Sequence, residues 1–297
     1  MKRTCIFASY DKEGVINKYV VSFLKYIREI SDEIIFVSDC NFPDSELKKI
    51  EGLISYHCCE HHGEYDFGSY KKGLLYLLEK DNGQIASDEL ILCNDSCFCI
   101  SNLSDLFNAM SKKKCDFWGA TSSLCPSLHL QSFFLVIKNN VANSDVFLSY
   151  FKNVRKQSSV LEVINCYEVP FLSEMEKAGF VGASFLPPVN DNPTFFPIHL
   201  IQQGIPLVKK KVFSEPDYSK QSLFKLGKEI KHINQQMYLE LLDYYKETNM
   251  LYIWFNRFFK MISDKFKKFK IIKIDYFSSG SVRYRFLGIP FFFKIKK

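Results

Sequence analysis

The stretch ELILCNDS, residues 89–96, decides how the fold of this chain can be predicted. Residues 89–93 form a short, largely apolar run of the kind found in buried β-strands. The polar residues Asn94 and Asp95 follow this run directly. In open α/β sheets, ligands bind beyond the carboxyl ends of the strands, so both side chains stand where a ligand is expected. Taken alone, Asp95 is equally compatible with an ordinary turn cap.

Further apolar runs lie on both sides of this strand and alternate with amphipathic segments. We expect strands at residues 4–8, 33–37, 54–56, 117–120 and 133–137, and helices at 14–27, 69–79, 146–154 and 169–178. Strands that alternate with helices predict an α/β domain, a mixed Rossmann-type sheet flanked by helices. We place this domain at residues 1–215 and a helical, basic extension at residues 216–297.

The composition is that of an ordinary globular protein. Of the 297 residues, 47% are hydrophobic and 24% are charged, which excludes a disordered chain. No apolar run reaches the roughly 18 residues of a membrane-spanning helix. The apolar run near the N-terminus is too short for a signal peptide. We therefore expect a cytoplasmic protein whose 10 cysteines are free thiols.

Positive charge is concentrated towards the end of the chain. Residues 251–297 contain 12 Lys and Arg against only Asp264 and Asp275, whereas the rest of the chain is mildly acidic. Within residues 255–269, Phe and Ile recur on one side of a predicted helix and Lys on the other. Such a helix suits the anionic inner surface of a membrane, and we expect a peripheral membrane protein. A helix pair with a solvated basic face is the alternative, and no nucleic-acid motif accompanies the lysines.

Two further segments carry candidate site residues. In residues 61–73, Gly63 and Gly68 frame Asp66 ahead of a helix, so backbone could approach a ligand there, although an ordinary loop would look similar. Glu168 stands at the predicted start of the helix at 169–178. The helix dipole would keep this carboxylate ionised and available as a base, unless it is a plain first-turn acid.

Metal binding by Cys and His is disfavoured. Residues 57–62 are rich in both types, but adjacent side chains on an extended segment point to opposite faces. The sequence contains no Cys-x-x-Cys pair of the kind found in structural zinc sites. His129 and Gln131, in contrast, precede a buried strand and could orient a sugar, or His129 could simply cap a loop.

The order of these segments resembles the bacterial rhamnan synthesis protein F family, which contains glycosyltransferases that build rhamnose-rich and other surface polysaccharides. The resemblance spans roughly residues 4–215. It is carried by seven segments in sequence order, at residues 9–14, 36–39, 63–74, 92–96, 116–119, 129–134 and 167–169.

The arrangement is also similar to inverting glycosyltransferases of the GT-A fold. In those enzymes a first strand binds the nucleotide base, a later strand carries an Asp-x-Asp metal motif, and an acidic base opens a helix. Residues 94–96 stand at the metal motif with a single carboxylate, Asp95. The resemblance therefore implies Mg²⁺ or Mn²⁺ held by Asp95 and the diphosphate. It also implies that Glu168 is the base.

The resemblance implies an inverting hexosyltransferase. It would move rhamnose, galactofuranose or another hexose from a nucleotide-diphosphate sugar to a lipid-linked glycan of a lipopolysaccharide O-antigen, capsule or rhamnan. The expected nucleotide-sugar contacts are Ser9, Tyr10, Asp39, Asp66, Lys72, Asn94 and Asp95. The expected sugar or acceptor contacts are Trp118, His129 and Gln131. The alternative is a non-catalytic module that binds membrane or nucleic acid on a degenerate α/β scaffold.

Overall fold

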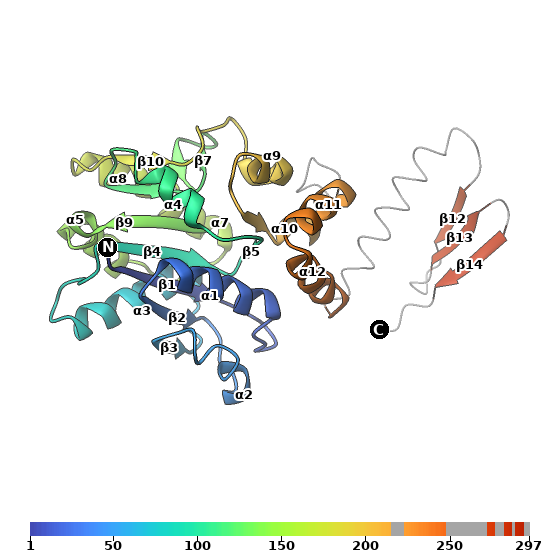
Figure 1. The fold of residues 1–297 in the computed structure, drawn as a ribbon, viewed down its shortest axis with the longest axis horizontal. Coiled ribbons are helices and arrows are strands. Elements are labelled where there is room, and N and C mark those ends of the chain that lie inside the picture. Colours follow the sequence, from blue (N-terminus) through green and yellow to red (C-terminus); the bar gives the residue numbers. More distant parts are fainter. Residues whose placement is uncertain (215–222, 248–271, 277–281, 287–288, 294–297) are drawn as a thin grey trace. The chain divides into compact units, whose positions relative to one another are not determined.

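The computed structural model describes residues 1–214, 223–247, 272–276, 282–286 and 289–293 (Figure 1). Contacts divide the chain into two units, Met1–Tyr244 and Tyr245–Lys297. The first unit contains the sheet that the sequence predicts. Each unit is described by itself below.

A seven-stranded sheet forms the centre of the first unit. In spatial order its strands are β10 (Gly182–Ser184), β6 (Phe117–Gly119), β9 (Phe134–Lys138), β4 (Glu89–Asn94), β1 (Arg3–Ser9), β2 (Glu33–Ser38) and β3 (Tyr56–Cys59). Strands β4, β1, β2 and β3 run parallel, whereas β9 is antiparallel to both β4 and β6. All six residues of β4 are buried, as expected for a strand covered on both faces.

Helices surround this sheet (Figure 1). They are α1 (Lys18–Ile30), α2 (Asp44–Leu47), α3 (Tyr65–Lys80), α4 (Ser104–Met110), α5 (Asn139–Ala142), α6 (Asp145–Lys152), α7 (Val160–Val163), α8 (Phe171–Lys177), α9 (Pro197–Gln202), α10 (Lys211–Ser214), α11 (Leu223–Ile233) and α12 (Gln235–Glu247). A π-helical turn, η1 (Ile164–Glu168), joins α7 to the segment before α8, and a 3₁₀ turn, η2 (Pro193–Phe195), precedes α9.

Helices α1 and α3 cover opposite faces of the parallel strands. Neighbouring residues of a strand point to opposite faces. Ile6 of β1 meets α3, where a Cβ at Gly73 would lie only 2.5 Å from its Cγ2 atom. Phe7, the next residue, packs edge to face on Phe23 of α1, with ring centroids 5.3 Å apart. Both faces of these strands are therefore shielded from water. This packing fixes the positions of the strands whose ends form the site.

Two small antiparallel sheets lie beside the carboxyl ends of the parallel strands. Strand β5 (Cys97–Cys99), which follows β4 almost directly, pairs with β11 (Leu207–Lys209). Strand β7 (Ser122–Ser123) pairs with β8 (His129–Leu130). The first of these pairings brings a segment from late in the chain beside Asn94 and Asp95.

The structure confirms the predicted α/β fold with a mixed sheet flanked by helices. Three boundaries differ. Helix α1 begins at Lys18, four residues later than predicted. Strand β3 begins at Tyr56, where the prediction for this strand ends, because an edge strand open on one side needs no continuous apolar run. Helix α3 begins at Tyr65, a turn earlier than predicted, so Asp66 lies in its first turn and not in the preceding loop.

The first unit continues beyond residue 215, where we placed the domain boundary. Helix α12 is tied to α1 by a 3.1 Å ion pair between Lys18 and Asp243 and by a 2.7 Å hydrogen bond from Ser22 Oγ to Glu240 Oε2. The second unit contains a three-stranded antiparallel sheet of β12 (Ile272–Tyr276), β13 (Val282–Phe286) and β14 (Ile289–Phe293).

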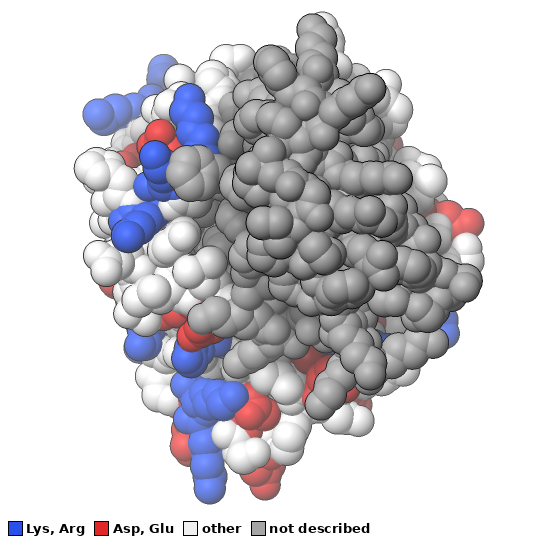
Figure 2. Space-filling model, turned by 90° about the vertical axis from the view of Figure 1, so that its right-hand side faces the viewer, with Lys and Arg blue, Asp and Glu red and all other residues white. Residues whose placement is uncertain are grey.

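Strands β12, β13 and β14 lie within the extension at residues 216–297, which we expected to be helical. The predicted basic helix at residues 255–269 lies outside the described residues. Where described residues reach the surface in Figure 2, Lys and Arg side chains are interspersed with Asp and Glu. Among the residues that the structure describes, no helix is both long enough and apolar enough to cross a membrane.

Candidate active site

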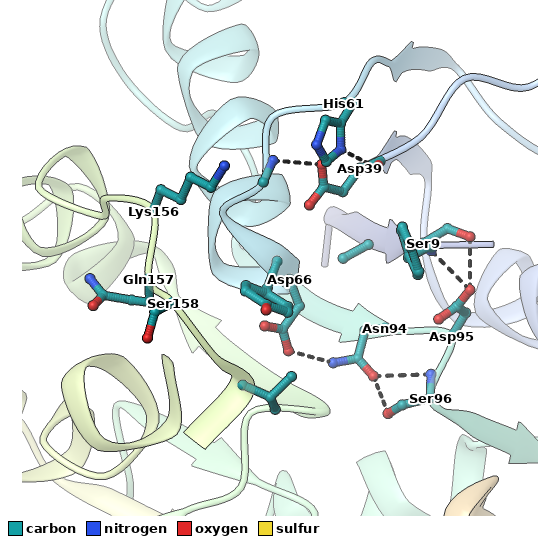
Figure 3. A pocket seen from close by; sticks show the side chains of 15 residues that line it. Ser9, Asp39, His61, Asp66, Asn94, Asp95, Ser96, Lys156, Gln157 and Ser158 are labelled. Atoms are coloured by element: carbon teal, nitrogen blue, oxygen red, sulfur yellow. Dashed lines mark hydrogen bonds and ion pairs between the residues drawn. The ribbon is translucent and has the colours of Figure 1, made fainter. Parts of the chain in front are cut away.

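Two adjoining cavities lie at the carboxyl ends of the parallel strands. The first, of about 590 Å³, is lined by the residues that end or follow β1, β2 and β4 and by a loop at residues 156–158 (Figure 3). The second, of about 330 Å³, is lined by Glu168 and by three consecutive lysines, among others. Five residues line both cavities: Tyr65, Asp66, Asn94, Ser96 and Val160. The two cavities are therefore parts of one site.

Asp95 joins the end of β4 to the end of β1. Its Oδ2 atom accepts hydrogen bonds from Ser9 Oγ at 2.9 Å and from the backbone N–H of Tyr10 at 3.1 Å. Its Oδ1 atom lies 3.8 Å from Lys210 Nζ. Its backbone carbonyl accepts a 3.3 Å hydrogen bond from the Tyr19 hydroxyl. Asp95 is buried, so these contacts hold the floor of the first cavity in one geometry.

Asn94 connects the same strand to α3. Its Nδ2 atom donates a 2.9 Å hydrogen bond to Asp66 Oδ2, and its Oδ1 atom accepts from both the backbone and the hydroxyl of Ser96 (Figure 3). Lys209 Nζ in turn donates to Ser96 Oγ at 2.7 Å. Because every link in this chain of contacts uses a specific polar group, the side chains between the cavities are fixed in place.

Asp66 is the carboxylate that faces both cavities. Burial, helped by the negative charge of Glu168 and opposed by Lys209, raises the pKa of Asp66 from 3.8 to about 6. The carboxyl group of Asp66 therefore takes up a proton close to pH 6. The electrostatic influence of Glu168 on Asp66 also indicates that the acids of the two cavities belong to one charge network.

Asp39 forms another wall of the first cavity. Its Oδ1 atom accepts hydrogen bonds from the backbone N–H groups of His62 and Gly63, at 2.7 and 2.8 Å, and lies 3.0 Å from His61 Nδ1. Gly63 has a φ of +71°, a conformation that favours glycine. The predicted contacts Ser9, Asp39 and Asp66 all line this cavity, and so does Tyr10, which is 55% exposed.

Glu168 is held in the second cavity by Ser132. Its Oε2 atom accepts hydrogen bonds from the backbone N–H of Ser132 at 2.8 Å and from the Ser132 hydroxyl. Its Oε1 atom lies 4.0 Å from Nε2 of the buried His129. The Glu168 side chain keeps 14% of its surface exposed, so a ligand group in the second cavity can still reach it.

The predicted helix-dipole stabilisation of Glu168 is wrong. Glu168 ends the π-helical turn η1, which continues α7 without a break, and α8 begins only at Phe171. No free helix N-terminus therefore points at this carboxylate, and the two donors of Ser132 replace it. π-Helical turns are rare and often lie at functional sites, because they change where a side chain points.

The structure brings Asp95, Asn94, Gln131 and Glu168 to the two cavities, but not every predicted residue. Gln131 lines the second cavity, where its Nε2 atom donates to Asn192 Oδ1 at 3.0 Å. His129 contacts the site only through Glu168.

Lys72 and Trp118 are the predictions that the structure moves away from the site. Lys72 Nζ forms a 2.6 Å ion pair with Glu60 and lines neither cavity. Trp118 is 3% exposed and packs between Phe107 and Phe134 in the core. The side chains of one helix or strand point to different sides of that element. The sequence alone did not reveal whether Lys72 and Trp118 lie on the side that faces the cavities.

Lys209, Lys210 and Lys211 are the site residues that sequence analysis missed. They follow the apolar residues Leu207 and Val208 and so end a short strand, which was the available signal. Lys156, also missed, lines the first cavity. These cations face a site rich in carboxylates and supply the positive charge that an anionic ligand would require there.

The residues around Asp95 fit a divalent cation poorly. Its Oδ2 atom already accepts two hydrogen bonds, and an ammonium group stands beside its Oδ1 atom. Mg²⁺ and Mn²⁺ need several oxygen ligands, and neighbouring ammonium groups would repel them. Within the described part of the chain, no three His, Cys, Asp or Glu side chains come together in a way that could hold a metal ion.

Comparison with known proteins gives one extensive match in sequence. A model of the family described as rhamnan synthesis protein F matches residues 34–274, which is most of the chain. No curated protein matches the sequence.

Several solved structures are similar to this chain at low sequence identity, each with a TM-score below 0.5. A cytidylyltransferase from Leptospira borgpetersenii is 7% identical, with 62% of this chain and 75% of that chain covered and a TM-score of 0.39. The apo form of the glycosyltransferase GlyE from Streptococcus pneumoniae is 10% identical, with 83% and 64% covered and a TM-score of 0.42. The core-mannan synthase CmsA/Ktr4 from Aspergillus fumigatus, in a Mn/GDP form, is 10% identical, with 51% and 63% covered and a TM-score of 0.31.

Proposed function

The chain belongs to the rhamnan synthesis protein F family, and we propose that it is an inverting glycosyltransferase that uses a nucleotide-diphosphate sugar. Family membership supports a glycosyltransferase. The joined cavities carry the finer proposal, because they bring Asp95 and Glu168, which are far apart in sequence, to one continuous space.

The first cavity suits the nucleotide part of the donor. Asp39 can accept hydrogen bonds from ribose hydroxyls or a base N–H, and the exposed ring of Tyr10 offers a surface for stacking. The sugar would then lie near Asp66 and Asn94, where the two cavities meet. The acceptor would enter the second cavity beside Gln131 and Glu168.

The reaction needs a base on the acceptor side. Glu168 would take the proton of an acceptor hydroxyl while that oxygen forms a bond to the anomeric carbon. The bond from this carbon to the diphosphate breaks, and its electron pair goes to the phosphate oxygen. Because base and leaving group stand on opposite sides of the sugar, the configuration at the anomeric carbon inverts. Ser132 orients the Glu168 carboxylate through two hydrogen bonds.

The sugar is rhamnose, galactofuranose or another hexose, and the acceptor is a lipid-linked surface glycan. The high positive charge of residues 251–297 supports an enzyme held at an anionic membrane surface, where such acceptors are found. Replacing Lys265, Lys267, Lys268 and Lys270 by Glu should abolish sedimentation of the full chain with anionic liposomes. Unchanged sedimentation would rule out this mode of attachment.

Glu168→Gln tests the catalytic proposal. The variant should bind the donor nucleotide as the wild type does, because the substitution leaves the first cavity intact, yet lose about 10²–10⁴-fold in transfer rate. Donors are found by thermal shift with UDP-, dTDP- and GDP-sugars, since a bound ligand raises the unfolding temperature. Transfer is then followed by nucleotide release with a lipid-linked acceptor. No stabilisation by any nucleotide sugar would support a non-catalytic binding module.

A further inference from the structure

We propose that the ammonium groups of Lys209 and Lys210, and not a divalent cation, neutralise the diphosphate of the donor. This inference rests on the proposed glycosyltransferase function and names the groups that stabilise its leaving group. It starts from the observation that the hydrogen-bond donors around Asp95 would fit a divalent cation poorly.

The two lysines reach the site through strand pairing. β11 lies antiparallel to β5, with Lys209 opposite Cys97, and the backbone N–H of Lys210 donates to the carbonyl of Ser96 at 2.8 Å. β5 follows directly on the polar end of β4. The register therefore sets both ammonium groups beside the residues that, by position, would hold a metal.

Their side chains are held by specific contacts. Lys209 Nζ donates to Ser96 Oγ at 2.7 Å and lies 4.5 Å from the centre of the Phe133 ring. Lys210 Nζ donates to the Tyr19 hydroxyl at 2.7 Å and lies 3.8 Å from Asp95 Oδ1. Preorganised charges of this kind stabilise developing negative charge without having to reorganise during the reaction.

The charges of the site also favour this arrangement. Asp66, Asp95 and Glu168 supply negative charge, and Lys209 and Lys210 offset part of it before the donor binds. The side chain of Lys210 is 23% exposed, so a diphosphate oxygen can reach its ammonium group while the contact with Asp95 persists. A lysine ammonium carries three donors and no acceptor, which suits the oxygens of a phosphate.

In the transfer step both lysines stay protonated. As the bond between the anomeric carbon and the phosphate oxygen breaks, the electron pair passes to that oxygen, and the two ammonium groups donate hydrogen bonds to the diphosphate. The acceptor oxygen bonds to the anomeric carbon, and its proton goes to Glu168. Atoms and charge balance without a metal ion.

Calorimetric titration of the full chain with UDP, dTDP and GDP, in EDTA and in Mg²⁺, tests the inference. The wild type should bind its preferred nucleoside diphosphate with affinities in the two buffers that agree within about 3-fold. Lys209→Gln and Lys210→Gln should each weaken this binding by at least about 10-fold, with little effect on the corresponding nucleoside. Lys210→Arg keeps the charge and should retain EDTA-resistant binding.

Lys177→Gln is the matched control, because Lys177 is a highly exposed lysine of α8 paired with Glu174 and lies outside both cavities. Thermal unfolding of each variant without ligand shows whether it is folded. If Lys210→Gln does not fold, Lys209→Gln alone is enough to test the inference. Loss of wild-type binding in EDTA with recovery in Mg²⁺, or unchanged affinity in both Gln variants, would overturn the inference and leave the proposed function standing. Absence of binding by every nucleoside diphosphate in both buffers would overturn both.

Discussion

The two cavities are built in different ways. The first is lined by residues that end or directly follow buried strands, such as Ser9, Asp39 and Asp95. The second is assembled from segments that lie far apart in the chain, among them Glu168 and Lys209. Ser9, Asp39 and Asp95 each follow an apolar run in the sequence, whereas the lining of the second cavity depends on pairings between distant segments. The part of the site expected to hold the nucleotide is thus local in sequence, whereas the part expected to hold the diphosphate and the acceptor is not.

This comparison predicts that substitutions at the strand-end residues of the first cavity weaken both folding and donor binding. Asp95→Ala leaves the Ser9 hydroxyl and the Tyr10 N–H without their acceptor in a buried place. We expect the free energy of unfolding to fall by about 3 kcal/mol and nucleotide binding to be lost. Urea unfolding and calorimetry measure both. A variant with full stability and full nucleotide affinity would show that Asp95 does not organise this cavity.

Asp66, which both cavities share, should give the site its pH dependence. Its pKa is raised from 3.8 to about 6 on folding. The folded state therefore binds this proton more tightly than the unfolded state. The resulting stabilisation is complete below about pH 4 and is lost as the pH rises through 6.

Asp66→Asn removes this titration. The unfolding free energy of the variant, relative to the wild type, should rise by about 2 kcal/mol between pH 4 and pH 7, because wild-type Asp66 must ionise away from water over that range. Urea unfolding at a series of pH values measures the difference. A difference that stays constant with pH would mean that Asp66 ionises without cost in the folded protein.

The smallest effect is expected for Ser132→Ala, which alters only the lining of the second cavity. The variant loses the hydroxyl that donates to Glu168 but keeps the backbone donor. We expect kcat to fall about 10-fold with KM for the donor unchanged, since one of two hydrogen bonds to the base is lost. Steady-state kinetics with varied donor separates the two constants. A change in donor KM at constant kcat would place Ser132 on the donor side instead.

Much of the fold follows from local patterns. Apolar runs and helical periodicity located β1, β2, β4, β6 and β9, because burial on both faces demands such runs. The edge strand β3 and the first turn of α3 were misplaced, since partly exposed segments carry weaker signals. Glu168 was singled out by its place near a predicted helix start and by the family resemblance, although the helix α8 begins only at Phe171.

The sequence by itself determined the α/β class, the polar ends of the parallel strands and the carboxylates Asp95 and Glu168. Only the tertiary structure decided that Ser132 holds Glu168, that Lys72 and Trp118 stay away from the site, and that two lysines at the end of β11 reach the residues after β4. The physical reason is that a strand end leaves a local pattern of apolar and polar residues. The pairing of β5 with β11 depends instead on register and packing between distant segments, and these leave no such pattern.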